Sequence, residues 1–291
     1  MKLRIKWPTV AAAGALLAAS FLVTDAPAAA QPAATCSTTS TGKTIEEDIG
    51  GRPYLLFVPP GLSGPAPLIV ALHGGQSNPA KFEGESGWTG FASANKVIVA
   101  YPRGSKNEGT DKWAWEFARN VGPDVPFLRN VVGEITGKYC VASERIHFVG
   151  HSNGGQMTSR MACDASDLIA SAAVWAGAKG AWDTSANECP TNRPIAFGVM
   201  LNDNDPVIWQ WVAEQHRDHW REMNDCGAEH SESGPGVLRG QRFDCAAGTQ
   251  VVYRLYDGPE DVTKAHDWPA GDRGADVRNR MWALFNSNPL P

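Results

Sequence analysis

The chain has 291 residues and a formal net charge of −5 at pH 7, with 43% hydrophobic and 20% charged residues. A mildly acidic chain argues against nucleic acid or an anionic membrane surface as a partner, because both attract basic proteins. The length is sufficient to bury a substantial core.

The first thirty residues have the pattern of an export signal. Three cations within the first six residues precede an apolar run over 11–23, and small residues close to position 30 offer cleavage sites. That run is too short for a permanent membrane anchor. We therefore expect residues 1–30 to be a signal peptide and residues 31–291 to form one secreted domain. Cleavage removes three cations and one anion, which moves the net charge from −5 to −7.

Beyond residue 30, apolar runs typical of strands alternate with segments of helical periodicity. Asp124–Tyr139 has apolar residues at helical spacing, and Asp124 is expected to be its N-cap. The predicted strands are Arg52–Val58, Pro67–Leu72, Lys96–Tyr101, Arg145–Val149, Leu168–Trp175, Ile195–Leu201 and Val251–Tyr256, and the further predicted helices are Gln156–Met161, Val207–Met223 and Val277–Phe285. This alternation predicts an α/β fold, with a mostly parallel sheet flanked by helices on both faces as in α/β-hydrolases.

The sequence Gly150-His151-Ser152-Asn153-Gly154 lies between a predicted strand and a predicted helix. In that context G-x-S-x-G forms a nucleophile elbow, a turn so tight that the neighbours of the serine must be small. Ser152 is therefore the predicted nucleophile.

A serine hydroxyl needs an imidazole to accept its proton, and the imidazole needs a carboxylate to fix its tautomer. In this fold the chain order is serine, acid, histidine. Of the histidines after Ser152, His266 lies in a loop between the last predicted strand and helix, where the base is expected; the others are His216, His219 and His230.

Two aspartates compete for the role of the acid. Asp205 and Asp203 both follow the strand Ile195–Leu201. We favour Asp205, because Pro206 and Val207 begin the next predicted helix and would hold its carboxylate in place.

The oxyanion of a tetrahedral intermediate requires preorganised donors. One is expected to be the backbone N–H of Asn153, and the second to come from the Leu72–Gln76 loop, where Gly75 is favoured over Gly74. His73 is expected to be a structural hydrogen bonder in that loop.

The six cysteines favour three disulfides in an exported protein, and their spacing lacks the C-x-x-C pairs of zinc sites. Counting leaves the pairing open among Cys36, Cys140, Cys163, Cys189, Cys226 and Cys245. His216 and His219 are three residues apart, which alone is weak support for a metal, so neither a metal nor an organic cofactor is expected.

In combination, these motifs make the chain resemble the extracellular poly(3-hydroxybutyrate) depolymerase / feruloyl esterase group of α/β-hydrolases. The resemblance rests on Tyr54–Gly61, Leu72–Gly75, Gly87-Trp88, Val99–Pro102, Asp124–Arg129, the Ser152 motif, Asp205–Val207 and His266–Pro269. It implies Ser152, Asp205 and His266 as a catalytic triad, and disulfides Cys226–Cys245, Cys163–Cys189 and Cys36–Cys140.

The chain also departs from the group around these motifs. Leu201-Asn202-Asp203 replaces a His-Gly-Thr-like turn, Thr263-Lys264-Ala265 replaces glycines before the histidine, and Trp209 and Trp211 stand where a small polar turn is usual. These changes bear on substrate preference more than on chemistry. Aromatic rings near the site are suited to stacking on substrate, and Trp268 is the predicted substrate contact.

The expected function is a secreted, monomeric serine ester hydrolase that acts on polyester oligomers or acylated plant polysaccharide. An exported acyltransferase would use the same triad with a sugar hydroxyl in place of water. A catalytically silent binding homologue would be indicated by a displaced His266 loop, and Lys264 keeps that alternative open.

Overall fold

The computed structural model describes residues 39–118, 121–178 and 189–291, which all belong to the compact unit Cys36–Pro291. Its strands are β1 Ile45–Ile49, β2 Arg52–Phe57, β3 Ala66–Leu72, β4 Ile98–Pro102, β5 Lys106–Gly109, β6 Lys112–Ala114, β7 Val141–His151, β8 Ser171–Trp175, β9 Ala196–Asn202, β10 Glu229–Ser231, β11 Val237–Asp244 and β12 Gln250–Tyr256. Its α-helices are α1 Pro79–Ser86, α2 Trp88–Asn95, α3 Asp124–Lys138, α4 Asn153–Asp164, α5 Gln210–Met223 and α6 Gly271–Asn286, with 3₁₀ turns at Ala246–Gly248 and Val262–Lys264. The predicted signal peptide, residues 1–30, lies outside the described residues.

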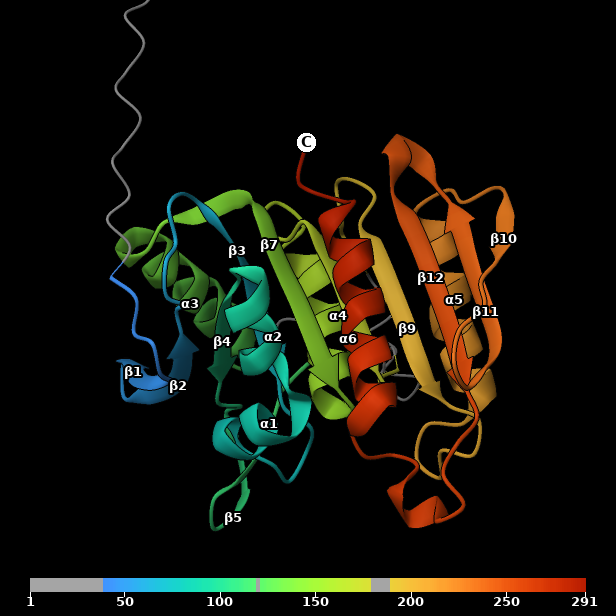
Figure 1. Ribbon diagram of the computed structural model, residues 1–291, viewed down its shortest axis with the longest axis horizontal. Helices are drawn as coiled ribbons and strands as arrows, with labels where there is room; N and C mark the ends of the chain where they lie inside the picture. Colours follow the sequence, from blue (N-terminus) through green and yellow to red (C-terminus); the bar gives the residue numbers. More distant parts are fainter. Residues whose placement is uncertain (1–38, 119–120, 179–188) are drawn as a thin grey trace, which may run out of the picture. The chain divides into compact units, whose positions relative to one another are not determined.

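The central sheet has the strand order β1-β2-β4-β3-β7-β8-β9-β12-β11-β10. Strands β4, β3, β7, β8, β9 and β12 pair in parallel, and antiparallel strands flank them at both edges. Helices α1, α2 and α6 cover one face, and α3, α4 and α5 cover the other (Figure 1). The predicted α/β-hydrolase layout is confirmed.

Strand β3 shows how the sheet separates two cores. All seven of its residues are buried. Leu68, Val70 and Leu72 pack with α3, α4 and α5, while Ile69 and Ala71 pack with α1, α2 and α6. Because alternate side chains of a strand point to opposite faces, a continuous apolar run is what a doubly covered sheet requires.

The start of α3 differs from the prediction. Asp124 was expected to be the N-cap, but the helix begins at Asp124 itself, and Pro123 occupies the cap position without a side-chain bond. Asp124 is fully buried, pairs with Arg52 Nη2 at 2.6 Å and accepts the amide of Glu116 at 2.7 Å. Its carboxylate therefore joins β2 to the loop after β6, which a local helix pattern does not reveal.

Three other helices begin away from their predicted positions. Helix α4 begins at Asn153, directly after the nucleophile and three residues before Gln156. Helix α5 begins at Gln210, not Val207, because the Asp205 carboxylate holds the amides of Val207 and Ile208 in a preceding turn. Helix α6 begins at Gly271, six residues before the predicted start at Val277. Its first turns are polar, so they carry no apolar periodicity.

Disulfides join Cys163 to Cys189 and Cys226 to Cys245, the pairs that the resemblance implied. Cys140 is also disulfide-bonded, and its expected partner Cys36 lies outside the described residues. Within the described residues, no helix has the length and apolar character needed to cross a bilayer.

Candidate active site

Ser152 occupies a strained turn between β7 and α4. Its backbone has φ 50° and ψ −118°, which a non-glycine residue rarely adopts. Its amide donates to the carbonyl of Trp175 at 3.0 Å. A Cβ on Gly150 would lie 2.2 Å from the carbonyl oxygen of Gly154, and one on Gly154 would lie 2.3 Å from that of Leu72. Both glycines are thus required by backbone packing, as the motif predicts.

The structure brings Ser152, His266 and Asp205 together. His266 Nε2 is 2.8 Å from Ser152 Oγ, and His266 Nδ1 is 3.0 and 2.9 Å from the two carboxylate oxygens of Asp205. The Asp205 side chain is fully buried and that of His266 is 18% exposed. A carboxylate that accepts Nδ1–H leaves the Nε2 lone pair facing the serine hydroxyl, which is the arrangement for proton abstraction.

Asp205 is held by more than the histidine. Its Oδ1 also accepts the amides of Val207 and Ile208, each at 2.8 Å. One carboxylate oxygen therefore fixes both the imidazole and the backbone that follows the acid.

Asp203 has a different set of contacts. Its Oδ1 accepts the amide of Gly258 at 2.9 Å, and its own amide donates to the carbonyl of Tyr256 at 2.9 Å. Asp203 therefore ties the end of β9 to the loop after β12, and it is Asp205 that contacts His266.

His151, the residue before the nucleophile, contacts the histidine loop. Its Nε2–H donates to the backbone carbonyl of His266 at 2.7 Å, and the two imidazole centroids are 5.2 Å apart. Burial, together with the proximity of His266, lowers the pKa of His151 to about 4, so the ring is neutral at pH 7. The G-x-S-x-G motif does not predict this contact, because it leaves the position before the serine unspecified.

The expected oxyanion donors lie around the same serine. Asn153 is the first residue of α4, where an amide has no partner within the helix and the helix dipole favours negative charge. Its side-chain Oδ1 accepts the amide of Trp115 at 2.6 Å. A Cβ on Gly74 would lie 3.6 Å from Ser152 Cβ, and one on Gly75 would lie 3.6 Å from Asn153 Cβ. Gly74 therefore borders the nucleophile, and Gly75 borders the residue after it.

His73, in the Leu72–Gln76 loop, is fully buried. Its Nδ1–H donates to the carbonyl of Gly74 at 2.7 Å, and its Nε2 accepts the amide of Gly104 at 3.1 Å. Burial lowers its pKa to about 4. A neutral imidazole with both nitrogens engaged is a structural element, in keeping with the expectation for His73.

Trp268 packs behind the His266 loop. It is 6% exposed, meets Phe82 edge to face with ring centroids 5.3 Å apart, and lines a hollow of about 440 Å³ with Lys264 and Arg273. Its predicted contact with substrate stays a prediction, and its burial gives it a packing role in supporting the loop.

The paired histidines of α5 have separate surroundings. His216 is buried, with Nε2 2.8 Å from Ser159 Oγ and 3.1 Å from the indole Nε1 of Trp220. A ring nitrogen of His219 lies within 4.8 Å of the sulfur atoms of Cys163 and Cys189. Those two sulfurs form a disulfide and are therefore not thiolate ligands.

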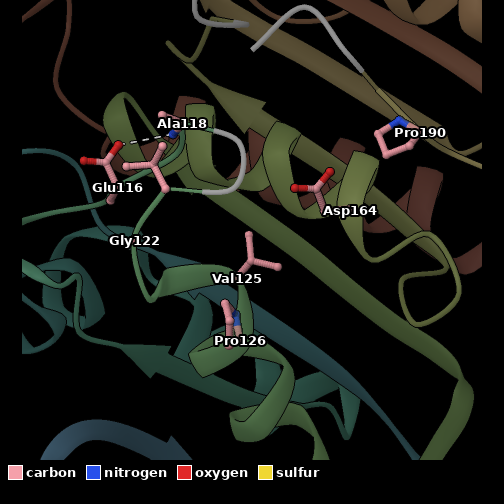
Figure 2. Close-up of a pocket in the computed structure, with 8 residues that line it drawn as sticks. Glu116, Ala118, Gly122, Val125, Pro126, Asp164 and Pro190 are labelled. Atoms are coloured by element: carbon pink, nitrogen blue, oxygen red, sulfur yellow. Dashed lines mark hydrogen bonds between the residues drawn. The ribbon is translucent and has the colours of Figure 1, made fainter. Parts of the chain in front are cut away.

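A second hollow, of about 500 Å³, lies between the start of α3 and the far end of α4 (Figure 2). Its lining includes Glu116, which accepts the amide of Ala118 at 3.2 Å, and Asp164. Helix α4 separates Asp164 from Ser152 by about 18 Å at 1.5 Å per residue. Glu116, another residue of the lining, follows Trp115, whose amide donates to Asn153 Oδ1 beside Ser152.

Comparison with known proteins agrees with this architecture. Residues 52–187 match the family model described as esterase PHB depolymerase. Feruloyl esterase B of Piromyces equi is 29% identical over 223 residues, 69% of this chain and 40% of that protein. Poly(3-hydroxyalkanoate) depolymerase C of Paucimonas lemoignei is 30% identical over 167 residues, 55% of this chain and 38% of that protein. The chain thus spans less than half the length of these two relatives.

Other relatives align over most of their length. Feruloyl esterase D of Neurospora crassa is 26% identical over 281 residues, 89% of this chain and 91% of that protein. Among solved structures, an acetyl xylan esterase from Aspergillus awamori superposes with a TM-score of 0.67 at 17% identity, over 84% of this chain and 99% of that one, which shows the shared fold. The predicted resemblance is confirmed: the chain is a relative of the poly(3-hydroxybutyrate) depolymerase and feruloyl esterase group of α/β-hydrolases.

Proposed function

We propose that the chain is a secreted serine ester hydrolase in which Ser152, His266 and Asp205 form the catalytic triad. The observation that carries the proposal is the continuous hydrogen-bond path from Ser152 Oγ through the imidazole to the buried Asp205 carboxylate. A silent homologue would be indicated by a displaced His266, whereas His266 Nε2 is 2.8 Å from the hydroxyl.

The reaction is a two-step acyl transfer. Ser152 Oγ attacks the ester carbonyl as His266 Nε2 takes its proton, and the resulting imidazolium is stabilised by Asp205. His266 then donates the proton to the leaving alkoxide. In the second step the same imidazole deprotonates water, which attacks the acyl-enzyme carbonyl. The bond to Ser152 Oγ then breaks, His266 returns the proton to that oxygen, and the acid is released.

Backbone amides stabilise the negative charge that develops on the carbonyl oxygen. The donors are the N–H of Asn153 at the start of α4 and the N–H of Gly75, with Gly74 as the alternative second donor. Loss of one such donor typically costs about 3–4 kcal/mol in the barrier.

The substrate is an ester of a polymer. Relatives named feruloyl esterase and poly(3-hydroxyalkanoate) depolymerase support two classes, acylated plant polysaccharide and hydroxyalkanoate oligomers. Export is supported by the signal-like pattern of residues 1–30 and by the disulfides, which persist in oxidising compartments.

Hydrolysis of p-nitrophenyl acetate by the wild-type chain and by Ser152→Ala tests the proposal. We expect the variant to lose about 10⁴-fold or more in kcat, because removal of the nucleophile leaves only the oxyanion donors and binding. Ser287→Ala is the matched control, since Ser287 is an exposed residue whose hydroxyl only donates to the carbonyl of Ala283. Equal activity of Ser152→Ala and this control would refute the triad.

A further inference from the structure

Exposed apolar side chains are concentrated directly after the acid. Of six large hydrophobic residues exposed in the described part of the chain, three are Val207, Trp209 and Trp211, at 57%, 54% and 47%. We call these three residues the tryptophan surface. The remaining three are far from one another in sequence: Val121, Leu238 and Val262. Apolar groups gathered in this way beside a catalytic group mark a binding surface.

The tryptophan surface is held on fixed backbone. At one end, the amides of Val207 and Ile208 donate to Asp205 Oδ1. At the other end, the carbonyl of Trp209 accepts the amide of Val212 at 2.9 Å, within the first turn of α5. Helix α5 is itself anchored by buried side chains that include Val212 and Trp220. The two indoles are therefore exposed on a rigid segment, so substrate binding need not order the backbone.

The indole rings form a pair. Their centroids are 5.9 Å apart and the planes are inclined by 45°. Among the described residues, neither ring stacks on a third aromatic group, and neither indole N–H has a protein acceptor. Each ring thus offers an apolar face and a free donor at its edge, and polar Gln210 lies between them in sequence.

The surface lies within reach of the reacting ester. The same Asp205 oxygen that accepts the Val207 amide at 2.8 Å is 3.0 Å from His266 Nδ1. Trp209 is four residues beyond Asp205, so their Cα atoms are at most about 15 Å apart at 3.8 Å per residue. A polymer of several units whose ester lies at Ser152 is therefore long enough to span that distance.

We propose that Val207, Trp209 and Trp211 bind the saccharide chain of an acylated plant polysaccharide and hold its ester at Ser152. A sugar ring combines an apolar C–H face with a rim of hydroxyls, which matches an indole face with an adjacent N–H donor. A hydroxyalkanoate chain offers carbonyl acceptors for an indole N–H but has no flat C–H face along its length, so it would match only one of the two properties. The inference rests on the proposed function and names its substrate class.

Binding of unacylated xylohexaose to the wild-type chain, followed by titration calorimetry, tests the proposal. We expect the Trp209→Ala/Trp211→Ala double variant to lose at least about tenfold in affinity, as is usual when exposed aromatic anchors are removed. The double variant with phenylalanine at both positions keeps an aromatic face and should recover part of the affinity. Leu238→Ala, which removes a side chain of similar exposure on β11, should bind like the wild type.

Three outcomes would overturn the proposal: no binding of xylohexaose by the wild type, equal affinity of the double alanine variant and Leu238→Ala, or Trp-dependent binding of a hydroxybutyrate hexamer in place of xylohexaose. Circular dichroism of each variant establishes that it is folded. Because the sugar carries no ester, the measurement does not depend on turnover. A failure here is therefore distinct from a failure of Ser152 to hydrolyse p-nitrophenyl acetate.

Discussion

Two segments meet at His266 and are built in opposite ways. The Ser152 turn, residues 150–155, is enclosed by backbone, and its glycines leave no room for a single methyl group. The acid loop, residues 203–211, buries the Asp205 carboxylate but presents two half-exposed tryptophans to solvent. The contrast separates two tasks, because reacting atoms must be fixed within a fraction of an ångström whereas substrate choice requires accessible side chains.

The acid loop offers the sharpest test of this division, because its two aspartates differ in their contacts. We expect Asp205→Asn to lower kcat by about 10⁴-fold, since an amide cannot stabilise the imidazolium and favours the wrong tautomer. The kcat of Asp203→Asn should stay within about threefold of the wild-type value, because a side-chain amide oxygen can still accept the amide of Gly258. Steady-state hydrolysis of p-nitrophenyl acetate distinguishes them, and comparable losses in both variants would break the assignment.

The Ser152 turn should not tolerate a methyl group. Gly154→Ala places a Cβ 2.3 Å from the carbonyl oxygens of Leu72 and His73, so we expect a loss of about 3 kcal/mol in the free energy of unfolding. Esterase activity should fall with it. Gly133→Ala in α3 is the matched control, since a Cβ there meets nothing within 4 Å and alanine favours a helix. Urea unfolding measures both, and a Gly154→Ala protein as stable as the control would contradict the packing argument.

His151 links the two halves of the site, so its loss should affect the rate more than substrate binding. We expect His151→Leu to lower kcat by about tenfold with little change in KM, the value of one positioning hydrogen bond. His151→Gln keeps an N–H donor and should remain within about threefold of the wild type. His230→Gln, at an exposed site, is the control. Equal losses in the Leu and Gln variants would show that only packing matters there.

Stability should depend on pH through three buried histidines. Burial lowers the pKa values of His73, His147 and His151 to about 4, 3 and 4, whereas the unfolded chain binds these protons near pH 6.5. The unfolded state therefore holds more protons below about pH 6.5, and the free energy of unfolding falls as pH decreases from there. Above that pH the three histidines are neutral in both states and no longer lower the free energy of unfolding.

Urea unfolding between pH 7 and pH 5 measures this slope. His151→Gln removes one of the three titrating groups. The slope of the free energy of unfolding against pH should therefore decrease by up to the equivalent of one bound proton. An unchanged slope would show that His151 is not neutral and buried in the folded chain.

The sequence predicted the centre of the fold better than its edges. Runs such as β3 are apolar throughout because both faces are covered, so they stand out without any knowledge of their partners. The edge strands β1, β10 and β11 are short or partly exposed and resemble loops in composition. Asp124 was misread because its partner, Arg52, is distant in sequence.

The candidate site shows the same limit. Ser152 and His266 follow from a motif and from chain order, and Asp205 is favoured by the residues after it. The bond that engages Asp203 with Gly258 is a contact across strands, which the sequence does not show. The role of His151 depends on a bond to a residue 115 positions away. Local pattern identifies which chemistry is present, whereas long-range contacts decide which of two similar residues performs it.

The shared oxygen of Asp205 has a consequence for engineering. That atom holds both His266 and the amides of Val207 and Ile208. Replacement of Asp205 by another residue would therefore also change the backbone conformation of residues 205–208. The positions beyond Ile208 are free of this constraint. A library of variants at positions 209 and 211 alone would therefore change which polymers bind, while the hydrogen bonds among Ser152, His266 and Asp205 stay as they are.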